Sequence, residues 1–507
     1  MKLNEESNDM KLEKDCIREA AAHVRFKTQP FIGGRYVDAI SGKTFASENP
    51  ATGEVLTDIM QCDQQDVDMA VQAARKAFDS GAWPKMHAYE RKEVLVRLAE
   101  LIEKNADELA ILDALDAGKP ISDCVNIDIP EAVHCFRWHA EAADKLYGQV
   151  SPTGPGTVGM IIREPIGAVG AVVPWNFPLL MAAWKLGPAL ATGNTVVAKP
   201  SKQTTLSILR LAELAQEAGV PDGVLNAVSG PGETVGQALG RHMGIDAITF
   251  TGSTEVGRKL LQYSSESNLK RIVLELGGKS PQVVMGDVTD LDYVAEHVVN
   301  AAFWNMGENC SAGSRLVVHN SIKDALLEKV IARTREWPVG DPLEPTTKIG
   351  SMIDKRQMEK VLGYIETGEA EGAKVVLGGK RILHETGGYF IEPTIFENVQ
   401  NNMKIAQEEI FGPVLVTTTF ETEAEAIAIA NDTPYGLAAS LHTDDVSVAH
   451  RLARAIRAGT VSVNCYSEGD ITTPFGGYKQ SGFGGRDNGP HAHDQYTEIK
   501  TIWIQLK

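Results

Sequence analysis

The spacing of apolar residues predicts a helical region followed by regions in which strands and helices alternate. Between Asp66 and Lys145 apolar residues recur every three or four positions, as in VDMAVQAARKAFDSG, which predicts amphipathic helices. After Val158 short apolar runs end in Gly, Pro or Asn and are followed by helical patterns: GAVGAVVPWNFP, NTVVAKPSKQT, DAITFTGST and RIVLELGGK. This alternation predicts an α/β fold with a parallel sheet.

A second alternating region begins near Ser280 and includes SRLVVHN, AKVVLGGK and GTVSVNCY, which predicts another α/β domain. Before the helical region, FIGGRYVDAISGKTF alternates like a hairpin. The C-terminal YTEIKTIWIQL also alternates but has no partner beside it in sequence. It is either an edge strand of its own domain or a strand that pairs with another subunit.

Composition narrows the class of protein. The chain has 507 residues, 43% of them hydrophobic, and a formal net charge of -18, so it has no basic stripe for nucleic acid or an anionic membrane. The N-terminal MKLNEESNDMKLEKD is charged where a signal peptide is apolar, and no apolar run is long enough to span a membrane. We expect a cytoplasmic enzyme with a small-molecule substrate.

Six cysteines are scattered along the chain, and no CxxC spacing suggests a metal site. They are Cys16, Cys62, Cys124, Cys135, Cys310 and Cys465. Cys310 lies among small and polar residues in NMGENCSAGSR, and we expect this turn to lie near a helix start, which would lower the thiol pKa. Cys465 in VSVNCYSEG is a rival nucleophile, and each cysteine taken alone is more often a small buried side chain.

Polar residues stand where four predicted strands end: Asn176, Lys199, Ser253 and Glu275. Ligands of α/β proteins gather at the carboxyl ends of strands, so we expect these side chains to lie together. Ser253 in FTGSTEVG could cap a helix whose N–H groups hold a pyrophosphate, or it could belong to an ordinary capped turn. Lys199 could bind a ribose hydroxyl or simply be solvated.

The remaining two groups suggest acyl chemistry. Glu275 could activate water as a base, or it could bind backbone N–H groups. The Asn176 amide could stabilise an oxyanion with the Cys310 N–H, or it could be a turn residue between two prolines. Together with a thiol and a helix start that holds a pyrophosphate, these groups would allow an aldehyde to form a thiohemiacetal, lose a hydride to a nicotinamide to give a thioester, and be hydrolysed to a carboxylate.

Five motifs in order, PWNFP, LELGGKSP, GENCSAGSR, EEIFGPV and PFGGYKQSG, make the chain similar to the NAD(P)-dependent aldehyde dehydrogenase superfamily from about Phe31 to Trp503. The resemblance implies a Rossmann-like coenzyme domain, an α/β catalytic domain and a small β oligomerisation element, assembled as homodimers or homotetramers. The implied boundaries are an N-terminal extension (1–28), the coenzyme-binding domain (29–145 and 166–277), the catalytic domain (278–480) and the oligomerisation element (146–165 and 490–507).

By matching motif, the resemblance implies Cys310 as nucleophile, in preference to Cys465, with Glu275 as base and Asn176 at the oxyanion hole. Lys185 and Asp487 match a pair associated with proton relay. SGFGGRD is one glycine longer than the common pattern, and Asp replaces the usual Glu.

The resemblance also implies a site for NAD or NADP and no metal. NAD-preferring members often have Glu three residues after the strand-end lysine, whereas KPSK has Lys202, which could pair with a 2′-phosphate. We therefore expect NADP to be accepted along with NAD. The residues implied at the coenzyme are Trp175, Lys199, Lys202, Gly252, Ser253, Gly257, Leu276, Glu409 and Phe411.

For the substrate the resemblance implies a tunnel with acidic groups. Asp128 and Glu131 are spaced to share a helical face and match positions that bind the amino end of aminoaldehydes. The other implied residues are Phe177, Met181, Trp184, Glu468, Asp470 and Phe475. The acids favour a cationic or polar aldehyde, although they could also be a solvated acidic surface.

YSEGDITTPFGGYKQSG and the C-terminal tail are most similar to bacterial enzymes that oxidise γ-glutamyl-γ-aminobutyraldehyde, and to relatives acting on 4-guanidinobutyraldehyde or 4-aminobutyraldehyde in polyamine (putrescine) catabolism. Alternatives are a betaine aldehyde or broad-specificity dehydrogenase. A catalytically silent binding protein on this fold would not need Cys310, Asn176 and Glu275 together, and acyl-transferring members generally lack the base glutamate.

Overall fold

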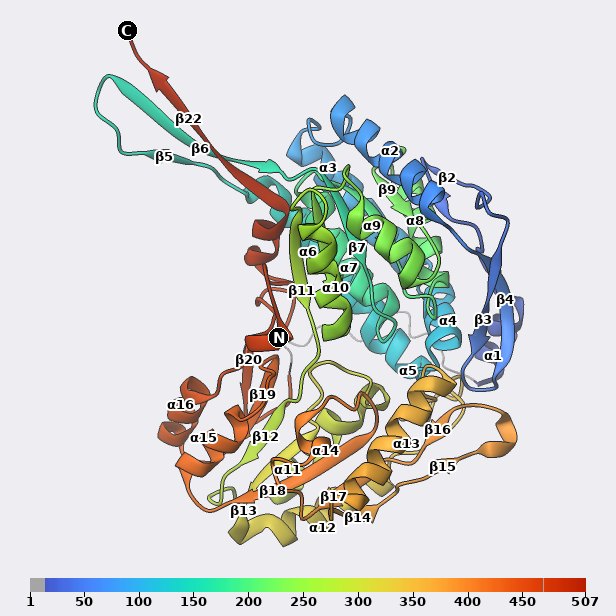
Figure 1. Cartoon of the computed structure of the whole chain (residues 1–507), viewed down its shortest axis with the longest axis vertical. Coiled ribbons are helices and arrows are strands. Elements are labelled where there is room, and N and C mark those ends of the chain that lie inside the picture. The colour runs from blue at the N-terminus through green and yellow to red at the C-terminus, as the bar shows by residue number, and fades with distance from the viewer. Residues whose placement is uncertain (1–13, 468) are drawn as a thin grey trace, which may run out of the picture.

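A computed structural model describes residues 14–467 and 469–507 of the chain. Figure 1 shows two α/β units packed against each other, and a β arm that extends away from the first unit. The first unit contains an eight-stranded sheet and the second a seven-stranded sheet. One pocket is lined by residues from both units.

The eight-stranded sheet has the order β2-β1-β9-β8-β7-β10-β11-β21. Its strands are β1 (Phe31–Ile32), β2 (Arg35–Tyr36), β7 (Ala168–Val172), β8 (Thr195–Lys199), β9 (Leu225–Ala227), β10 (Ala247–Thr251), β11 (Arg271–Glu275) and β21 (Gly482–Phe483). The five central strands, from β9 to β11 in the sheet order, pair in parallel. Antiparallel strands β1 and β2 complete the sheet on one side and β21 completes it on the other. The predictions of a parallel sheet and of the β1–β2 hairpin are therefore confirmed.

The predicted helical region is confirmed, because apolar stripes at three- and four-residue spacing pack against this sheet. The helices of the first unit are α1 (Lys14–His23), α2 (Gln64–Ser80), α3 (Ala88–Lys104), α4 (Ala106–Ala117), α5 (Ile121–Asp123), α6 (Ile129–Ala142), α7 (Pro178–Ala191), α8 (Leu206–Glu217), α9 (Gln237–Arg241) and α10 (Thr254–Ser265). Within the N-terminal extension, α1 contacts α4 and buries Ile17, so this part of the extension joins the core.

The seven-stranded sheet has the order β14-β17-β18-β13-β12-β19-β20. Its strands are β12 (Pro281–Val284), β13 (Arg315–His319), β14 (Lys374–Leu377), β17 (Thr394–Glu397), β18 (Val414–Phe420), β19 (Ala438–His442) and β20 (Thr460–Val463). Its helices are α11 (Leu291–Phe303), α12 (Lys323–Arg335), α13 (Lys355–Ala370), α14 (Lys404–Gln407), α15 (Glu423–Asn431) and α16 (Val446–Ala455). Only edge strand β14 runs antiparallel to its neighbour, so a second α/β unit is confirmed.

Short elements complete the described chain. Two small sheets pair β3 (Thr44–Asn49) with β4 (Glu54–Met60), and β15 (Arg381–Ile382) with β16 (Phe390–Ile391). The single-turn helices are η1 (Cys124–Asp128), η2 (Ala143–Lys145), η3 (Gly232–Gly236), η4 (Trp304–Gly307), η5 (Asn320–Ile322), η6 (His384–Thr386), η7 (Lys479–Ser481) and η8 (Pro490–Tyr496).

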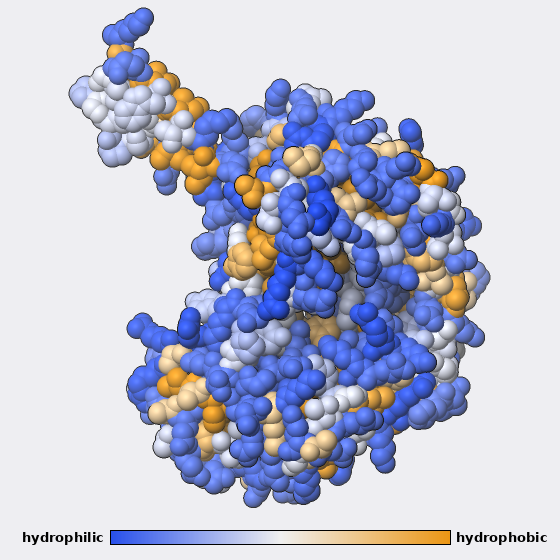
Figure 2. Space-filling view, viewed as in Figure 1, coloured by the Kyte–Doolittle hydropathy of each residue, from blue (hydrophilic) through white to orange (hydrophobic). Residues whose placement is uncertain are grey.

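The arm is a three-stranded sheet of β5 (Gln149–Ser151), β6 (Thr157–Pro165) and β22 (Thr497–Gln505). The C-terminal strand β22 pairs antiparallel with β6 along its whole length, so it is an edge strand within its own chain. Large apolar side chains on the arm are solvent-exposed in the single chain, and Figure 2 shows apolar surface along it. These are Val150, Ile499, Trp503 and Ile504.

Within the described residues, no helix has both the length and the apolar character needed to cross a membrane.

Candidate active site

The four polar residues expected at the strand ends do lie along one edge of the eight-stranded sheet. Lys199 and Glu275 end β8 and β11, Asn176 follows β7, and Ser253 follows β10. Because β8, β7, β10 and β11 are parallel neighbours, their carboxyl ends are adjacent. Sheet topology therefore brings these residues together from positions far apart in sequence.

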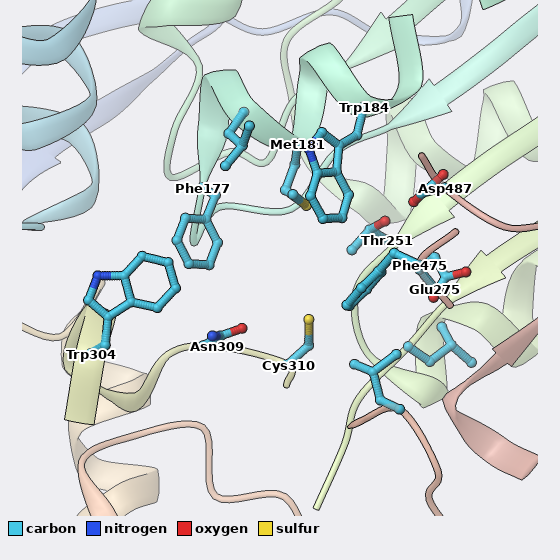
Figure 3. A pocket seen from close by; sticks show the side chains of 13 residues that line it. Phe177, Met181, Trp184, Thr251, Glu275, Trp304, Asn309, Cys310, Phe475 and Asp487 are labelled. Atoms are coloured by element: carbon cyan, nitrogen blue, oxygen red, sulfur yellow. The ribbon is translucent and has the colours of Figure 1, made fainter. Parts of the chain in front are cut away.

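A pocket at this edge contains both Cys310 and Glu275 (Figure 3). In Figure 3 the Cys310 thiol points into the pocket, with aromatic rings around it and Glu275 and Asp487 to one side. Helix α7 contributes Phe177, Met181 and Trp184 at its N-terminal end, at positions that share a helical face. The lining residues are Phe177, Leu180, Met181, Trp184, Thr251, Glu275, Leu276, Trp304, Asn309, Cys310, Leu437, Phe475 and Asp487.

Cys310 lies between the end of α11 and strand β13, not at the start of a helix as its surrounding residues suggested. The chain leaves α11 through three consecutive left-handed residues, Asn305, Met306 and Gly307, with φ of 52°, 58° and 67°. Two of these are not glycine, and such conformations cost free energy that neighbouring contacts must offset. The sharp turn places Cys310 at the pocket.

Hydrogen bonds between the two units hold this turn. The Asn176 side-chain amide donates to the Glu308 carbonyl at 2.9 Å, and the Asn305 amide donates to the same carbonyl at 3.0 Å and to the Asn176 carbonyl at 3.1 Å. The Glu308 carboxyl is buried and accepts the Ile353 N–H at 3.1 Å. Burial raises the pKa of Glu308 well above its usual value.

Glu275 has a strongly perturbed pKa. Burial raises the pKa of Glu275 well above its ordinary value, and the Asp487 carboxylate raises it further. The Lys185 and Arg486 cations and the Gly477 N–H act in the opposite direction. A carboxyl whose pKa is raised in this way is a stronger base when it is ionised than an exposed glutamate, which suits a general base.

Lys185 and Asp487, which the resemblance pairs, are in direct contact. The Lys185 ammonium lies 2.5 Å from Asp487 Oδ2, and both side chains are almost completely buried. The other Asp487 oxygen, Oδ1, accepts from the Gln495 amide of η8 at 3.2 Å. The shorter Asp therefore reaches the pocket wall although the usual residue is Glu.

A second set of groups adjoins the pocket and fits a dinucleotide. The Glu409 carboxylate accepts the Gly278 N–H at 2.9 Å, and a Cβ at Gly277 would lie 2.1 Å from the same carboxylate. Lys199 is buried, which lowers its pKa to about 8, and its ammonium donates to the Pro200 carbonyl at 2.7 Å. A carboxylate and an ammonium are suitable partners for ribose hydroxyls.

The start of α10 supplies the second part of this cradle. The Ser253 hydroxyl caps the helix by accepting the Val256 N–H at 3.3 Å. A Cβ at Gly257 would lie 2.9 Å from Leu276, and one at Gly252 would lie 2.5 Å from Phe250, so both glycines are packed closely by neighbouring side chains. The capped helix start is a favourable place for a pyrophosphate.

Trp175 and Phe411 pack edge to face across the cradle, with ring centroids 5.2 Å apart. Phe411 has a left-handed φ of 59°, and its carbonyl accepts the Gln357 amide at 2.6 Å. The Lys202 side chain is exposed, with its ammonium 5.5 Å from the centre of the Phe45 ring.

The structure corrects the expectation for Asp128. Asp128 belongs to the π-helical turn η1, and its carboxylate forms a fully buried ion pair with Lys119. Glu131 is exposed, so the two acids do not share a face. The Lys119 ammonium also lies 4.0 Å from the centre of the Phe177 ring, so this pair supports the pocket wall from behind.

The predicted acid Asp470 also lies outside the pocket lining. Asp470 is exposed and accepts hydrogen bonds from the Thr472 N–H at 2.7 Å and hydroxyl at 2.5 Å, which hold its pKa below the usual range. His134, one turn after Glu131, lowers the Asp470 pKa further, so these residues are neighbours. Glu468 lies outside the described residues.

Sequence reasoning missed several residues of the site. Leu180 and Leu437 line the pocket but belong to no motif, and Lys119 acts through Phe177. Leu180 could have been found from its place on α7 beside Met181. Lys119 has no sequence signal, because its partner Asp128 appeared to be a substrate ligand.

Comparisons with known proteins show the family. A model of the aldehyde dehydrogenase family matches residues 36–502. An aminoacetaldehyde dehydrogenase of Pseudomonas aeruginosa is 54% identical, covering 96% of this chain and 97% of its own. The NADP/NAD-dependent aldehyde dehydrogenase PuuC of Escherichia coli K12 is 47% identical, covering 97% and 98%.

A solved structure of a γ-glutamyl-γ-aminobutyraldehyde dehydrogenase from Burkholderia cenocepacia superimposes with a TM-score of 0.96. It is 51% identical and covers 97% of this chain and 100% of its own.

The strained turn before Cys310 makes a stability prediction. Gly307→Ala places a Cβ 2.3 Å from the Gly412 carbonyl in a left-handed backbone, so we expect a loss of at least about 1–3 kcal/mol of unfolding free energy. Gly363→Ala is the control, because Gly363 lies within α13 with open space at its Cβ. Chemical denaturation should show a loss only for Gly307→Ala; equal midpoints would contradict the strain.

Proposed function

The chain belongs to the aldehyde dehydrogenase family and is an aldehyde dehydrogenase, and we propose that it oxidises an ω-amino, guanidino or γ-glutamylamino aldehyde to a carboxylate with NAD or NADP. The observation that carries the chemistry is a single pocket with Cys310 on one side and a buried Glu275 on the other. The names of the aminoacetaldehyde and γ-glutamyl-γ-aminobutyraldehyde relatives support the substrate class.

The Cys310 thiolate attacks the aldehyde carbon to form a thiohemiacetal. One N–H of the Asn176 amide is held by the Glu308 carbonyl, which fixes the plane of the amide and leaves its second N–H for the developing oxyanion. The Cys310 N–H is the second donor in this proposal. The contact between the two units thus also orients a catalytic group.

The cradle formed by Lys199, Ser253, Glu409, Trp175 and Phe411 would hold the coenzyme. When bound, NAD or NADP supplies the oxidant that converts the thiohemiacetal to a thioester. Gly252, Gly257 and Leu276 belong to the same edge, where Leu276 packs against Gly257.

Glu275 is the base that takes a proton from water as the thioester hydrolyses. Its raised pKa makes the carboxylate a stronger base than an exposed glutamate, and the Asp487–Lys185 pair would then carry the proton away. The presence of Glu275 favours hydrolysis over transfer of the acyl group to coenzyme A or phosphate.

Exposed acidic groups outside the pocket lining favour a cationic substrate end. Glu131 and Asp470 are exposed, and the Asp470 charge interacts with His134, one turn after Glu131. The pocket wall itself is largely apolar, with Phe177, Trp184, Trp304 and Phe475 among its residues, which favours the second candidate, a broad-specificity dehydrogenase that also takes aliphatic aldehydes. Betaine aldehyde would fit either arrangement.

We also propose the domain boundaries that the sequence resemblance implies. We propose in addition that the chain forms a homodimer or homotetramer in which the arm makes intersubunit contacts, because such contacts would bury its exposed apolar side chains. The scattered cysteines favour a cytoplasmic location.

The substrate proposal predicts selectivity. We expect kcat/KM for aminoacetaldehyde, 4-aminobutyraldehyde, 4-guanidinobutyraldehyde or the γ-glutamyl derivative to exceed that for hexanal at least about tenfold, with betaine aldehyde also measured. Glu131→Gln should lower the values for cationic aldehydes and leave hexanal unchanged. Equal or better use of hexanal would instead identify a general aldehyde dehydrogenase.

The pKa of Glu275 predicts the pH dependence of hydrolysis. Because only the ionised carboxylate acts as base, the steady-state rate after a coenzyme-reduction burst should rise with pH through the Glu275 pKa. Asp487→Asn removes a charge that raises this pKa, so the midpoint should move to lower pH. Glu275→Gln should abolish the rise, and an unchanged profile in this variant would exclude Glu275 as the base.

The position of Lys202 leads to a prediction about the affinity for NADP. Lys202→Glu replaces a cation with a carboxylate that would repel the 2′-phosphate, so the Kd for NADP should increase about tenfold or more, with that for NAD changed less than threefold. Quenching of tryptophan fluorescence measures both values. Lys76→Glu, an exposed charge reversal on α2, is the control. A parallel loss for both coenzymes would show that Lys202 does not read the phosphate.

A further inference from the structure

The segment that follows β20 lies against the turn that carries Cys310. The hydroxyl of Tyr466 accepts a hydrogen bond from the Asn309 side-chain amide at 2.9 Å. The same hydroxyl lies 3.3 Å from the Ser311 hydroxyl. One phenol therefore contacts the residues on both sides of Cys310.

This segment is itself fixed to the second unit. Asn464 has a left-handed φ of 56°, and its side-chain amide pairs with the Thr443 N–H and carbonyl, both at 3.0 Å. The Tyr293 hydroxyl donates to the Asn464 carbonyl at 2.9 Å. The Tyr466 N–H donates to His297 Nδ1 at 3.2 Å, and burial lowers the pKa of His297, which keeps this nitrogen available as an acceptor.

Tyr293 and His297 both lie on α11, the helix that leads into the Cys310 turn. The nucleophile turn follows directly from the C-terminal end of this helix, and the segment with Asn464 and Tyr466 is hydrogen-bonded to the same helix about two to three turns earlier. The Tyr466 hydroxyl connects this segment to the Cys310 turn through its contacts with Asn309 and Ser311. The position of Cys310 relative to the pocket wall then depends on this hydroxyl as well as on the Asn176 contact.

We propose that Tyr466 is a positioning residue for Cys310, which acts through Asn309 and Ser311 and does not itself react. The inference rests on the proposed role of Cys310 and extends it. The left-handed residues before Cys310 are unfavourable by themselves. Contacts on both sides of Cys310, including those of Tyr466, must therefore keep the thiol and the Cys310 N–H in position. Small displacements of a nucleophile reduce rates strongly, because the reacting atoms must lie within a narrow range of distances.

The position of Tyr466 predicts a loss of kcat with little change in KM. Tyr466→Phe removes only the hydroxyl, so we expect kcat to fall about 5- to 20-fold, KM to change less than twofold, and the melting temperature to stay within about 2 °C of the unsubstituted protein. The rate constant for alkylation of Cys310 by iodoacetamide should change in the same variant, because the surroundings of the thiol change.

Tyr293→Phe is the matched control, since it removes a hydroxyl that binds the same segment but does not touch the Cys310 turn. The Asn464 and His297 contacts remain, so its kcat should stay within twofold. A Tyr466→Phe kcat within twofold, or equal losses in both variants, would overturn the positioning role. Either result would leave the proposed reaction standing if the unsubstituted protein turns over aldehyde and Cys310→Ala does not.

Discussion

The hydrogen bond from the Asn176 amide to the Glu308 carbonyl is the contact on which the site depends. Asn176 follows a strand of the eight-stranded sheet, whereas Glu308 belongs to the turn between α11 and the seven-stranded sheet. The nucleophile and the base therefore come from different units of the chain, and this hydrogen bond connects the two units beside Cys310. Asn305 reinforces it by donating to the same carbonyl, at the cost of a left-handed backbone that few residues adopt.

Burial of carboxyl groups is the second organising feature. Glu275, Glu308 and Glu409 all have pKa values raised by burial, and each lies at the edge where the two units meet. The Asp487 carboxylate at the same edge forms a buried ion pair with the Lys185 ammonium. The low polarity around Glu275 makes it a better base, whereas the nearby ion pair keeps charged groups within reach of its proton.

The sequence predicted the fold well where local pattern and topology agree. Runs such as NTVVAK and DAITFTGS are too apolar and β-branched for exposed structure, and their alternation with helices permits only a parallel sheet. That topology alone places four residues at one edge of the sheet: Asn176, Lys199, Ser253 and Glu275. The C-terminal strand was ambiguous because its partner β6 lies more than 300 residues earlier.

The site was less predictable where residues act through tertiary contacts. Asp128 was expected to face a substrate, but a π-helical turn directs it toward Lys119, and no sequence pattern marks such a turn. The left-handed residues before Cys310 also carry no signal, since only one of the three is glycine. Local sequence identifies which groups can react. The residues that pair with buried charges or stabilise a strained turn come from distant segments, so they are seen only in the folded structure.

The most direct test of the account is to trap the acyl group on Cys310. Glu275→Gln, mixed with NAD and excess 4-aminobutyraldehyde and then quenched in acid, should carry one acyl group on the Cys310 peptide by mass spectrometry, with one equivalent of NADH formed. Cys310→Ala should show neither. An acyl group at Cys465, or NADH formed without any protein-bound acyl group, would contradict a thioester at Cys310.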